Sequence, residues 1–340
     1  MEETPRFQRK PIATTVAPVV EIRPLLQDHS LPMLVTPCAD DIRLTAWVAS
    51  HRAEVERLLR QHHALLFRGF HRQHADQFAE FVRCTSDGEP LEYVDRTTPR
   101  NELGNGLYTS TTYPARLPIK LHNEGTYWTR WPLKLYFCCV TPAESGGETP
   151  IANLSHVLDQ MSPGLRSTFE RTGFLLERNY NDGLGLPWQE VFQTTDPATV
   201  ERYCSEHGIQ YTWRGTDRLQ TQQVRRAIRK HPWTGKDVWF NHAVFYHRSS
   251  YEPDVLRMLE NEVGPSGLPY RTLYGDGSPI PDDVVAEIRS LCNANRVAFA
   301  WQAGDMLLLD NMAVAHGREP YRGERLVAVA MKEPYGEQDA

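Results

Sequence analysis

The residues best suited to chemistry in this sequence are histidines that stand close to carboxylates. In His122-Asn-Glu124 the two outer residues are separated by one position, so on a β-strand their side chains point to the same face. Two ligands on one face can bind one metal ion. His74-Ala-Asp76 shows the same pattern, but it opens an amphipathic helix, where such residues lie on different faces, and we discard it. His122 and Glu124 are therefore either metal ligands or a solvated pair in a loop.

A third candidate ligand, His316, follows the apolar segment 305–310. Two histidines and one carboxylate on a β scaffold form the facial triad that holds Fe(II) and leaves three coordination positions open. Those positions suit a bidentate oxo-acid and O₂. A ligand set without thiolates fits Fe(II) better than structural zinc, which usually fills all four positions with Cys and His. A zinc hydrolase stays open as an alternative.

The second carboxylate of such an oxo-acid needs a fixed cation, and the planar guanidinium of arginine supplies one. Arg325 lies nine residues after His316 and begins the apolar segment 325–332. Arg325 either points inward and binds a carboxylate, or lies on the surface at the start of a strand. Thr149 follows the double glycine 146–147. Its hydroxyl either adds a hydrogen-bond donor or belongs to a residue that simply favours strands.

Several common catalytic signatures are absent from the sequence. It contains no Gly-x-Ser-x-Gly elbow, no Gly-x-x-x-x-Gly-Lys-Ser/Thr loop, no complete Gly-x-Gly-x-x-Gly and no His-Glu-x-x-His. Its 6 cysteines include no Cys-x-x-Cys pair, which disfavours zinc ribbons and dithiol redox sites. These absences leave the hydrolases, kinases and dinucleotide-binding proteins that carry such motifs without support.

The elements that must position the candidate residues are short strands separated by turns. Apolar and β-favouring runs predict strands at 64–70, 133–140, 149–153, 174–180, 210–213, 237–245, 296–301, 305–310 and 325–332. Amphipathic patterns predict helices at 54–63, 73–84, 155–161, 197–207 and 281–292, and residues 85–120 resemble a loop. The pattern predicts a mainly β protein with helical insertions. We expect a loosely ordered arm at 1–24 and a single domain at 25–340, with a helical insertion at about 155–295.

The composition is that of an ordinary globular protein. The chain has 340 residues, of which 40% are hydrophobic and 24% charged, and its formal net charge is −6. The acidic balance disfavours a nucleic-acid partner, and no apolar run approaches the ~18 residues of a membrane helix. The N-terminus is acidic with no apolar segment behind it, which does not fit a secretory signal. We therefore expect a cytoplasmic protein with reduced cysteines.

Taken together, the motifs resemble those of the taurine dioxygenase-like (TauD/TfdA) family of Fe(II)/2-oxoglutarate oxygenases. The resemblance is carried by His122-Asn-Glu124, Gly146-Gly-Glu-Thr149, and Asp310-Asn-Met-x-x-x-His316-Gly-Arg318 with Arg325. Within the family, the segments 65–70, 105–111, 239–241 and 274–280 resemble the branch of the syringomycin-pathway aspartyl hydroxylase and, more distantly, clavaminate synthase. The resemblance covers roughly residues 55–335.

The resemblance implies a double-stranded β-helix, also called a jelly roll or cupin-like core. It implies that His122, Glu124 and His316 bind Fe(II), and that Thr149 and Arg325 bind the distal carboxylate of the cosubstrate 2-oxoglutarate. With O₂, such an enzyme hydroxylates an unactivated C–H bond and releases succinate and CO₂. The protein contributes positioning and exclusion of water, since the oxidising power belongs to the metal and cosubstrate.

The resemblance also bears on the substrate. Glu124 stands where the taurine enzyme has Asp, and Glu is common in relatives that act on amino acids. This implies hydroxylation of an amino acid, free or presented on a peptidyl carrier protein, in nonribosomal peptide-type metabolism such as antibiotic biosynthesis. Related halogenases have a small residue here, so Glu124 favours hydroxylation over halogenation. Desaturation, epoxidation or cyclisation, a small sulfonate or carboxylate as substrate, and a non-catalytic ligand-binding jelly roll stay open.

Residues in the other family-like segments are candidates for the substrate pocket. Aromatic residues at such positions are often core residues instead, and Arg318 could equally pair with an acidic neighbour. The basic run 225–230 either faces an acidic carrier protein or is a solvated helix face. The candidates for substrate binding are Tyr108, Thr111, Trp239, Asn241 and Arg318.

Overall fold

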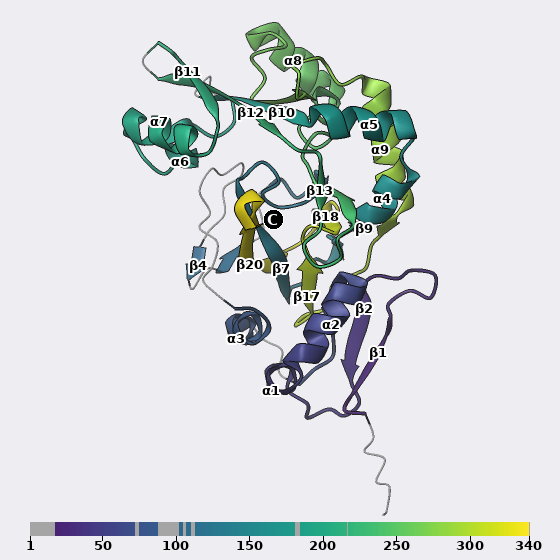
Figure 1. The fold of residues 1–340 in the computed structure, drawn as a ribbon. Coiled ribbons are helices and arrows are strands. Elements are labelled where there is room, and N and C mark those ends of the chain that lie inside the picture. Colours follow the sequence, from purple (N-terminus) through teal and green to yellow (C-terminus); the bar gives the residue numbers. More distant parts are fainter. Residues whose placement is uncertain are drawn as a thin grey trace, which may run out of the picture.

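The computed structural model describes residues 18–71, 75–87, 102–104, 107–109, 113–180, 184–215 and 217–339. Its largest sheet has eight strands in the order β1-β2-β3-β17-β7-β20-β5-β4 (Figure 1). Neighbouring strands are antiparallel, except that β2 and β3 are parallel. Their bounds are β1 Val20–Pro24, β2 Met33–Pro37, β3 Ala64–Phe67, β17 Met306–Asp310, β7 Arg130–Thr141, β20 Leu326–Gly336, β5 Leu107–Thr109 and β4 Glu102–Gly104.

Alternate residues of the central strands enter two separate apolar cores, because successive side chains of a strand point to opposite faces. In β17, Met306 and Leu308 belong to one core, whereas Leu307 and Leu309 belong to the other. The neighbours Cys138 and Cys139 are divided in the same way. Both faces are therefore buried, which explains why these strands have nearly continuous apolar sequences.

One face of the large sheet is covered by the first three helices, at the lower end of Figure 1. Their apolar faces, which include Val55, Leu59, Phe78 and Phe81, pack on β3, β7 and β17. The second helix ends at His63, whose left-handed φ of 62° turns the chain directly into β3. These helices are α1 Leu44–Ser50, α2 Arg52–His62 and α3 Ala75–Thr85.

The opposite face packs on a second sheet of four short strands in the order β16-β9-β18-β6. The two sheets form the sandwich of a jelly roll, so the predicted fold class is confirmed. Phe137 of β7 contacts His316 of β18 across the layer between them, with ring centroids 5.1 Å apart. The second sheet consists of β6 Ile119–His122, β9 Ile151–Asn153, β16 Arg296–Val297 and β18 Val314–Arg318, and beside it β8 Ser145–Gly146 pairs with β19 Tyr321–Arg322.

The segment between β9 and β16 is the predicted insertion, and it is not only helical. Its helices are α4 Leu154–Gln160, α5 Pro163–Thr172, α6 Trp188–Val191, α7 Pro197–Glu206, η1 Arg248–Ser250, α8 Pro253–Val263 and α9 Asp282–Ala294. Its sheet, in the order β11-β12-β10-β15, consists of β10 Phe174–Tyr180, β11 Gln210–Arg214, β12 Arg218–Arg225 and β15 Tyr270–Tyr274. A further hairpin pairs β13 Ile228–Lys230 with β14 Asp237–Trp239.

Several predicted elements differ from the structure. The expected loose arm contains β1, which pairs with β2, and the expected loop 85–120 contains β4, β5 and β6. The strand predicted for 237–245 ends at Trp239, because the Asn241 side chain accepts a hydrogen bond from Ala243 N and forms a turn. The strand predicted for 296–301 ends at Val297. Apolar composition marked these segments as buried without determining where backbone pairing stops.

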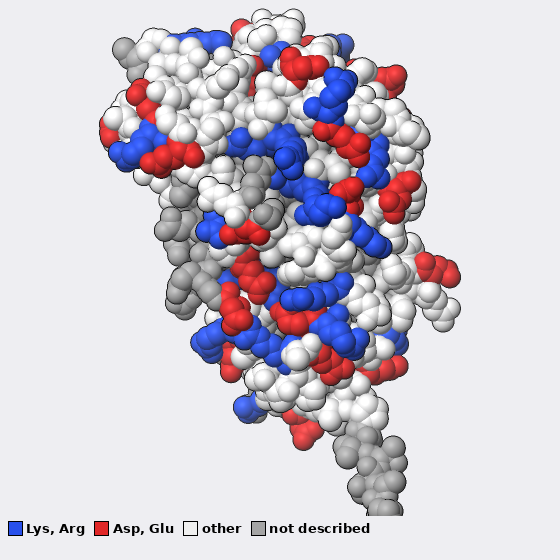
Figure 2. All heavy atoms as spheres, viewed as in Figure 1, with Lys and Arg blue, Asp and Glu red and all other residues white. Residues whose placement is uncertain are grey.

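No helix within the described ranges is long and apolar enough to cross a membrane. Acidic and basic side chains are interspersed over the face seen in Figure 2, with a band of Lys and Arg near its middle. This mixed distribution fits the small net charge of −6.

Candidate metal centre and substrate cavity

The three predicted metal ligands come together at the edge of the small sheet. His122 ends β6, and in the antiparallel ladder its partner on β18 is His316. The two rings lie side by side, with centroids 4.4 Å apart. Glu124 follows two residues later and is buried. Strand pairing therefore places residues distant in sequence next to one another.

The donor atoms of the triad lie close enough to share one ion. The distance from Glu124 Oε1 is 3.8 Å to His122 Nε2 and 3.8 Å to His316 Nε2. All three donor atoms lie within 4.8 Å of one another, and no other such group of three exists among the residues described. Since metal–ligand bonds from His and carboxylate are about 2.0–2.2 Å long, one ion fits between them.

The orientation of the His122 ring is also that of a metal ligand. Its Nδ1 donates a hydrogen bond to the Lys120 carbonyl oxygen at 2.9 Å. This bond requires the proton to sit on Nδ1, and it leaves the lone pair of Nε2 directed toward Glu124. Bonds of this kind fix the tautomer and the orientation of most metal-binding histidines.

Two buried asparagines connect the segments that carry the triad. The Asn311 side chain accepts a hydrogen bond from Glu124 N at 2.9 Å, and its amide group donates to Glu124 O at 2.9 Å and to Pro132 O at 2.8 Å. Asn123 donates in return to Asn311 O at 2.5 Å and to Val314 O at 3.1 Å. The backbone on both sides of the carboxylate is therefore held by hydrogen bonds.

The carboxylate of Asp310 stabilises the turn between β17 and β18. It accepts hydrogen bonds from His63 Nδ1 at 2.9 Å, His231 Nε2 at 2.8 Å and Met312 N at 3.1 Å. Burial alone would raise the pKa of Asp310, but the hydrogen bonds from His231 and His63 outweigh it and lower the pKa below 3.8. Asp310 is thus a buried anion that fixes the start of the His316 strand.

Thr149 is positioned to donate a hydrogen bond. It is buried, and its Oγ1 accepts a hydrogen bond from Trp301 Nε1 at 3.0 Å. An indole can only donate, so the Thr149 hydroxyl keeps its own proton for another acceptor. This arrangement suits one oxygen of a carboxylate.

Arg325 lies just before β20 rather than inside it, and it reaches back to the double glycine. Its Nε donates to Gly147 O at 3.0 Å, and its guanidinium carbon lies 5.6 Å from the centre of the Tyr321 ring. Gly147 has a φ of +75°, and a Cβ there would come within 3.0 Å of Arg325 Cδ and Nε. Glycine is thus required both for the turn and for the close passage of the arginine.

Arg325 carries a charge that needs an anion. Burial, together with the nearby Arg318, lowers the pKa of Arg325 to about 10, so it is still a cation at neutral pH. In the described part of the chain no carboxylate lies within ion-pair distance of it. Arg325 contacts Gly147, which precedes Thr149 by two residues. The desolvated guanidinium and the Thr149 hydroxyl both belong to this turn region, and together they fit the carboxylate of a 2-oxo acid.

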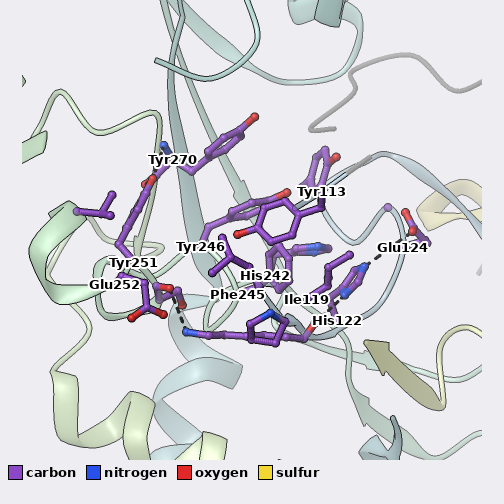
Figure 3. A pocket seen from close by; sticks show the side chains of 17 residues that line it. Tyr113, Ile119, His122, Glu124, His242, Phe245, Tyr246, Tyr251, Glu252 and Tyr270 are labelled. Carbon is purple, nitrogen blue, oxygen red and sulfur yellow. Dashed lines mark hydrogen bonds and ion pairs between the residues drawn. The ribbon is translucent and has the colours of Figure 1, made fainter. Parts of the chain in front are cut away.

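A cavity of about 360 Å³ opens beside the triad, and both His122 and Glu124 line it. Figure 3 shows that its walls are mostly aromatic. His242, Tyr246 and Tyr270 stack face to face, with successive ring centroids 5.1 and 4.8 Å apart and interplanar angles of 16°. Burial lowers the pKa of His242 to about 3, and its Nδ1 pairs with the Thr126 hydroxyl. This wall is therefore neutral and apolar at physiological pH.

The predicted substrate-binding residues are not gathered at this cavity. Tyr108, in β5, lies opposite Val329 of β20 and packs against the core between the sheets. Trp239 packs edge-on against Phe169, with centroids 4.8 Å apart. The Asn241 side chain donates a hydrogen bond to Ala227 O and accepts one from Ala243 N. Trp239 and Asn241 line a second cavity of about 370 Å³, which His122 also lines, and Thr111 lies outside the described residues.

Arg318 holds a loop beside the aromatic cavity. It is buried and donates to the carbonyl oxygens of Tyr113, Pro114 and Leu117 at 3.0, 2.7 and 2.7 Å. Tyr113 and Leu117 line the cavity. These contacts give Arg318 a role in shaping this wall.

The basic run 225–230 is also placed by the structure. It spans the end of β12 and all of β13, so neither end of it is a solvated helix face. Arg225 donates to Tyr127 O at 3.0 Å and to His207 O at 2.8 Å. The contacts of Arg225 connect the insertion to the segment that follows the metal ligands.

Comparison with known proteins agrees with this geometry. A family described as "Taurine catabolism dioxygenase TauD, TfdA family" matches residues 21–331. The chain belongs to the TauD/TfdA family. As a member, it is a dioxygenase that uses Fe(II) and 2-oxoglutarate, and the residues of the triad, with Thr149 and Arg325, fit both groups.

Two curated relatives match most of this TauD/TfdA chain. The dapdiamide synthesis protein DdaC of Enterobacter agglomerans is 37% identical over 313 residues, covering 92% of this chain and 94% of the relative. A clavaminate synthase-like protein of Arabidopsis thaliana is 29% identical over 340 residues, covering 97% of each. These two relatives agree with the branch that the sequence motifs indicated.

Solved structures of other oxygenases share the fold. PvcB of Pseudomonas aeruginosa has a TM-score of 0.57 at 15% identity, covering 94% of this chain and 93% of PvcB. A putative alpha-ketoglutarate-dependent taurine dioxygenase from Burkholderia xenovorans has a TM-score of 0.55 at 18% identity, covering 94% and 96%. At such low identity these likenesses show the fold alone.

Several residues of this TauD/TfdA site were missed by the sequence reasoning. Asn123 lies between two candidate ligands and Asn311 inside the quoted Asp310 motif, so their positions were visible although their roles were not. Lys120 precedes His122 by two residues and faces the same cavity, a signal that strand periodicity could have provided. Trp301 gave no comparable signal, because its contact with Thr149 spans 152 residues.

Proposed function

We propose that this TauD/TfdA enzyme hydroxylates an unactivated C–H bond of an amino acid in a biosynthetic pathway of the nonribosomal peptide type. Succinate and CO₂ are the co-products. The observation that carries the proposal is the His-Glu-His group, in which Glu124 and His316 are buried, at one end of a cavity with aromatic walls. The similarity to a dapdiamide synthesis protein supports a biosynthetic role on a small molecule.

Each residue of the site has a proposed task. His122, Glu124 and His316 hold Fe(II), while the Thr149 hydroxyl and the Arg325 guanidinium bind the distal carboxylate of 2-oxoglutarate. When bound, the metal and the cosubstrate supply the oxidant that attacks a C–H bond. The chain itself orients the substrate and excludes water.

Orientation and exclusion of water come from the walls of the cavity. The stacked rings of His242, Tyr246 and Tyr270 form a row of aromatic side chains along one wall of the cavity (Figure 3). Arg318 holds the loop that carries Tyr113 on another wall. A substrate held against these rigid surfaces reaches the metal in a restricted set of orientations, which favours attack at one carbon.

Titration of the purified protein with Fe(II) and 2-oxoglutarate under anaerobic conditions tests the cofactor assignment. We expect the weak visible metal-to-ligand charge-transfer band to appear for the wild type and to vanish for His316→Ala. The matched control is His156→Ala, since His156 is an exposed histidine on α4. Absence of the band in the wild type, or its persistence in His316→Ala, would contradict the proposed ligand set.

Product analysis then tests the reaction. With O₂ present, amino acids that stimulate succinate release should gain one oxygen atom, as measured by mass spectrometry. Loss of two hydrogens without added oxygen would instead indicate desaturation or ring closure. A small sulfonate that stimulates succinate release better than any amino acid would contradict the proposed substrate class.

A further inference from the structure

The aromatic cavity has a charged end opposite the metal ligands. In Figure 3, His122 and Glu124 lie at one end of the cavity, and Tyr251 and Glu252 lie at the other. The ammonium of Lys120 belongs to this second end, because it donates a hydrogen bond to Ser250 O at 3.0 Å. A cation and an anion therefore line the same end of one cavity.

Strand geometry relates the Lys120 side chain to the metal ligands. Lys120 and His122 are two residues apart in β6, so their side chains leave the same face of the strand, and both line the cavity. Their Cα atoms are separated by about 7 Å along the strand, and the lysine stem extends the span further. The interval leaves room for part of a substrate between the ammonium and the metal site.

Both charges at this end are exposed, and within the described ranges neither forms a close ion pair. An ammonium group has three donors, and the only hydrogen bond found for Lys120 within the described ranges uses one of them. In the same part of the chain, no ion pair within 4.0 Å includes Lys120 or Glu252. Two opposite charges therefore lie near each other at this end without a direct ion pair, and both are accessible to a ligand.

We propose that this end of the cavity binds the zwitterionic head of a free α-amino acid. The carboxylate of the substrate pairs with Lys120, and its ammonium pairs with Glu252. The side chain of the substrate then lies along the stacked rings and reaches the metal ligands. This inference rests on the proposed function and narrows it, because the amino acid is free rather than bound to a carrier protein.

The charges explain why the head group is free. A substrate attached to a carrier as a thioester has lost its carboxylate charge, and its neutral carbonyl would match Lys120 poorly. A zwitterion satisfies Lys120 and Glu252 at once. The cavity, at about 360 Å³, lies within the range of about 300–1,000 Å³ that is typical of small-molecule sites. Its wall contains three stacked aromatic rings, so we expect amino acids with long or aromatic side chains to fit best.

Anaerobic isothermal titration calorimetry tests this proposal on the protein loaded with Fe(II) and 2-oxoglutarate. The probes are free lysine, arginine, glutamine, phenylalanine, tyrosine and tryptophan, each compared with its α-carboxamide and its deaminated acid. At least one free amino acid should bind about tenfold or more tightly than its carboxamide, as expected for one charge-assisted contact.

Variants at Lys120 identify the source of that preference. In Lys120→Met the carboxylate and the carboxamide should bind within about twofold of each other, whereas Lys120→Arg should retain most of the difference. Loss of the Ser250 contact alone would weaken the binding of both ligands equally. The ratio of the two affinities therefore distinguishes recognition of the carboxylate by Lys120 from a structural role of Lys120. Lys236→Met, which removes an exposed lysine elsewhere, is the matched control and should leave the ratio unchanged.

Glu252→Gln tests the other charge. It should weaken binding of the amino acid by about tenfold and leave the deaminated acid unaffected. The proposal is overturned if wild-type protein binds carboxamides as tightly as free acids, or if Lys120→Met keeps the preference. It is also overturned if Fe(II) and 2-oxoglutarate bind but none of the six amino acids does, and that result leaves the oxygenase assignment intact. If Fe(II) and 2-oxoglutarate do not bind, that result would instead contradict the proposed function itself.

Discussion

At the scale of single residues, the site depends on charges that are buried and partly desolvated. Arg325 is a cation whose described contacts are a carbonyl oxygen and an aromatic ring. Thr149 is a hydroxyl whose lone pair is already occupied by Trp301. Both side chains keep donors that can serve a carboxylate, so a dicarboxylate cosubstrate fits them.

Replacement of Arg325 should chiefly affect 2-oxoglutarate. A charge-assisted hydrogen bond contributes about 1.5–3 kcal/mol, so Arg325→Met should weaken 2-oxoglutarate at least tenfold, measured by anaerobic titration. Arg325→Lys keeps the charge but not the planar guanidinium, so its affinity for 2-oxoglutarate should lie between those of Arg325→Met and the wild type. Unchanged 2-oxoglutarate affinity in Arg325→Met would show that another cation binds the cosubstrate.

The hydroxyl of Thr149 should make a smaller contribution. Thr149→Val keeps the shape of the side chain but removes the donor and leaves the Trp301 indole without its acceptor. We expect 2-oxoglutarate affinity to fall by about five- to tenfold, as for one ordinary hydrogen bond of about 1–1.5 kcal/mol. Thr149→Ser, which retains the hydroxyl, is the control and should stay within about threefold of the wild type.

At the scale of elements, the metal centre is built where β6 and β18 pair and where the next residues are clamped by asparagines. The His122–His316 pairing fixes two ligands, and the third is fixed by the contacts of Asn311 with the Glu124 backbone. The clamp makes the position of Glu124 depend on the turn that follows β17, rather than on its own loop alone.

Loss of this clamp should affect both folding and metal binding. Asn311→Leu leaves the buried N–H and C=O of Glu124 without partners, and we expect the free energy of unfolding to fall by about 2–5 kcal/mol. Fe(II) affinity should fall in parallel, because the carboxylate is no longer held. Asn311→Asp retains an acceptor for Glu124 N, so it should lower stability and Fe(II) affinity less than Asn311→Leu does. Thermal melts and Fe(II) titration of both variants measure these effects, and wild-type Fe(II) affinity in Asn311→Leu would refute the clamp.

The buried histidine His247 should make stability depend on pH. Burial lowers the pKa of His247, and although Asp282 opposes this, Arg289 and Arg248 act in the same direction as burial. The unfolded chain therefore binds a proton at higher pH than the folded chain, and stability should fall as the pH drops below about 6.5. The maximum slope from one group is about 1.4 kcal/mol per pH unit.

Replacement of His247 should reduce this slope. His247→Gln keeps hydrogen-bonding capacity near Ile280 O but cannot titrate. Denaturant unfolding of both proteins between pH 5 and 7.5 measures the difference. Parallel pH profiles for the variant and the wild type would mean that His247 binds its proton equally in the folded and unfolded chain.

At the scale of the whole molecule, the large sheet separates a structural core from the catalytic one. Leu308 is fully buried in the core beneath the first three helices, on the face of β17 turned away from the metal ligands. Leu307 and Leu309 face the core shared with the small sheet. The division predicts that stability and cofactor binding can be perturbed separately.

Leu308→Ala is the test of that separation. Removal of a buried leucine typically costs about 2–5 kcal/mol, so the melting temperature should fall clearly. The affinities for Fe(II) and 2-oxoglutarate should stay within about twofold of wild type at a temperature where the variant is folded. A large loss of cofactor affinity would show that the two cores are coupled through the sheet.

The sequence by itself determined the chemistry and much of the local structure. His122, Glu124 and His316 were recognisable because metal binding restricts both the residue types and their spacing on strands, and the structure brings their donor atoms together. The central strands β7 and β17 were predictable because both of their faces are buried. Local composition could reveal these features without any knowledge of the chain's path.

Only the tertiary structure decided which surfaces surround the metal site. Of the candidates for the substrate pocket, Trp239 and Asn241 line the second cavity, which His122 also lines, whereas Lys120 and Glu252 line the aromatic cavity. Lys120 and Glu252 are 132 positions apart, and their proximity depends on how the insertion folds back over β6. Periodicity records which face of a strand is buried, but it holds no information about which distant segment covers that face. The charged end of this cavity is therefore a property of packing between remote elements.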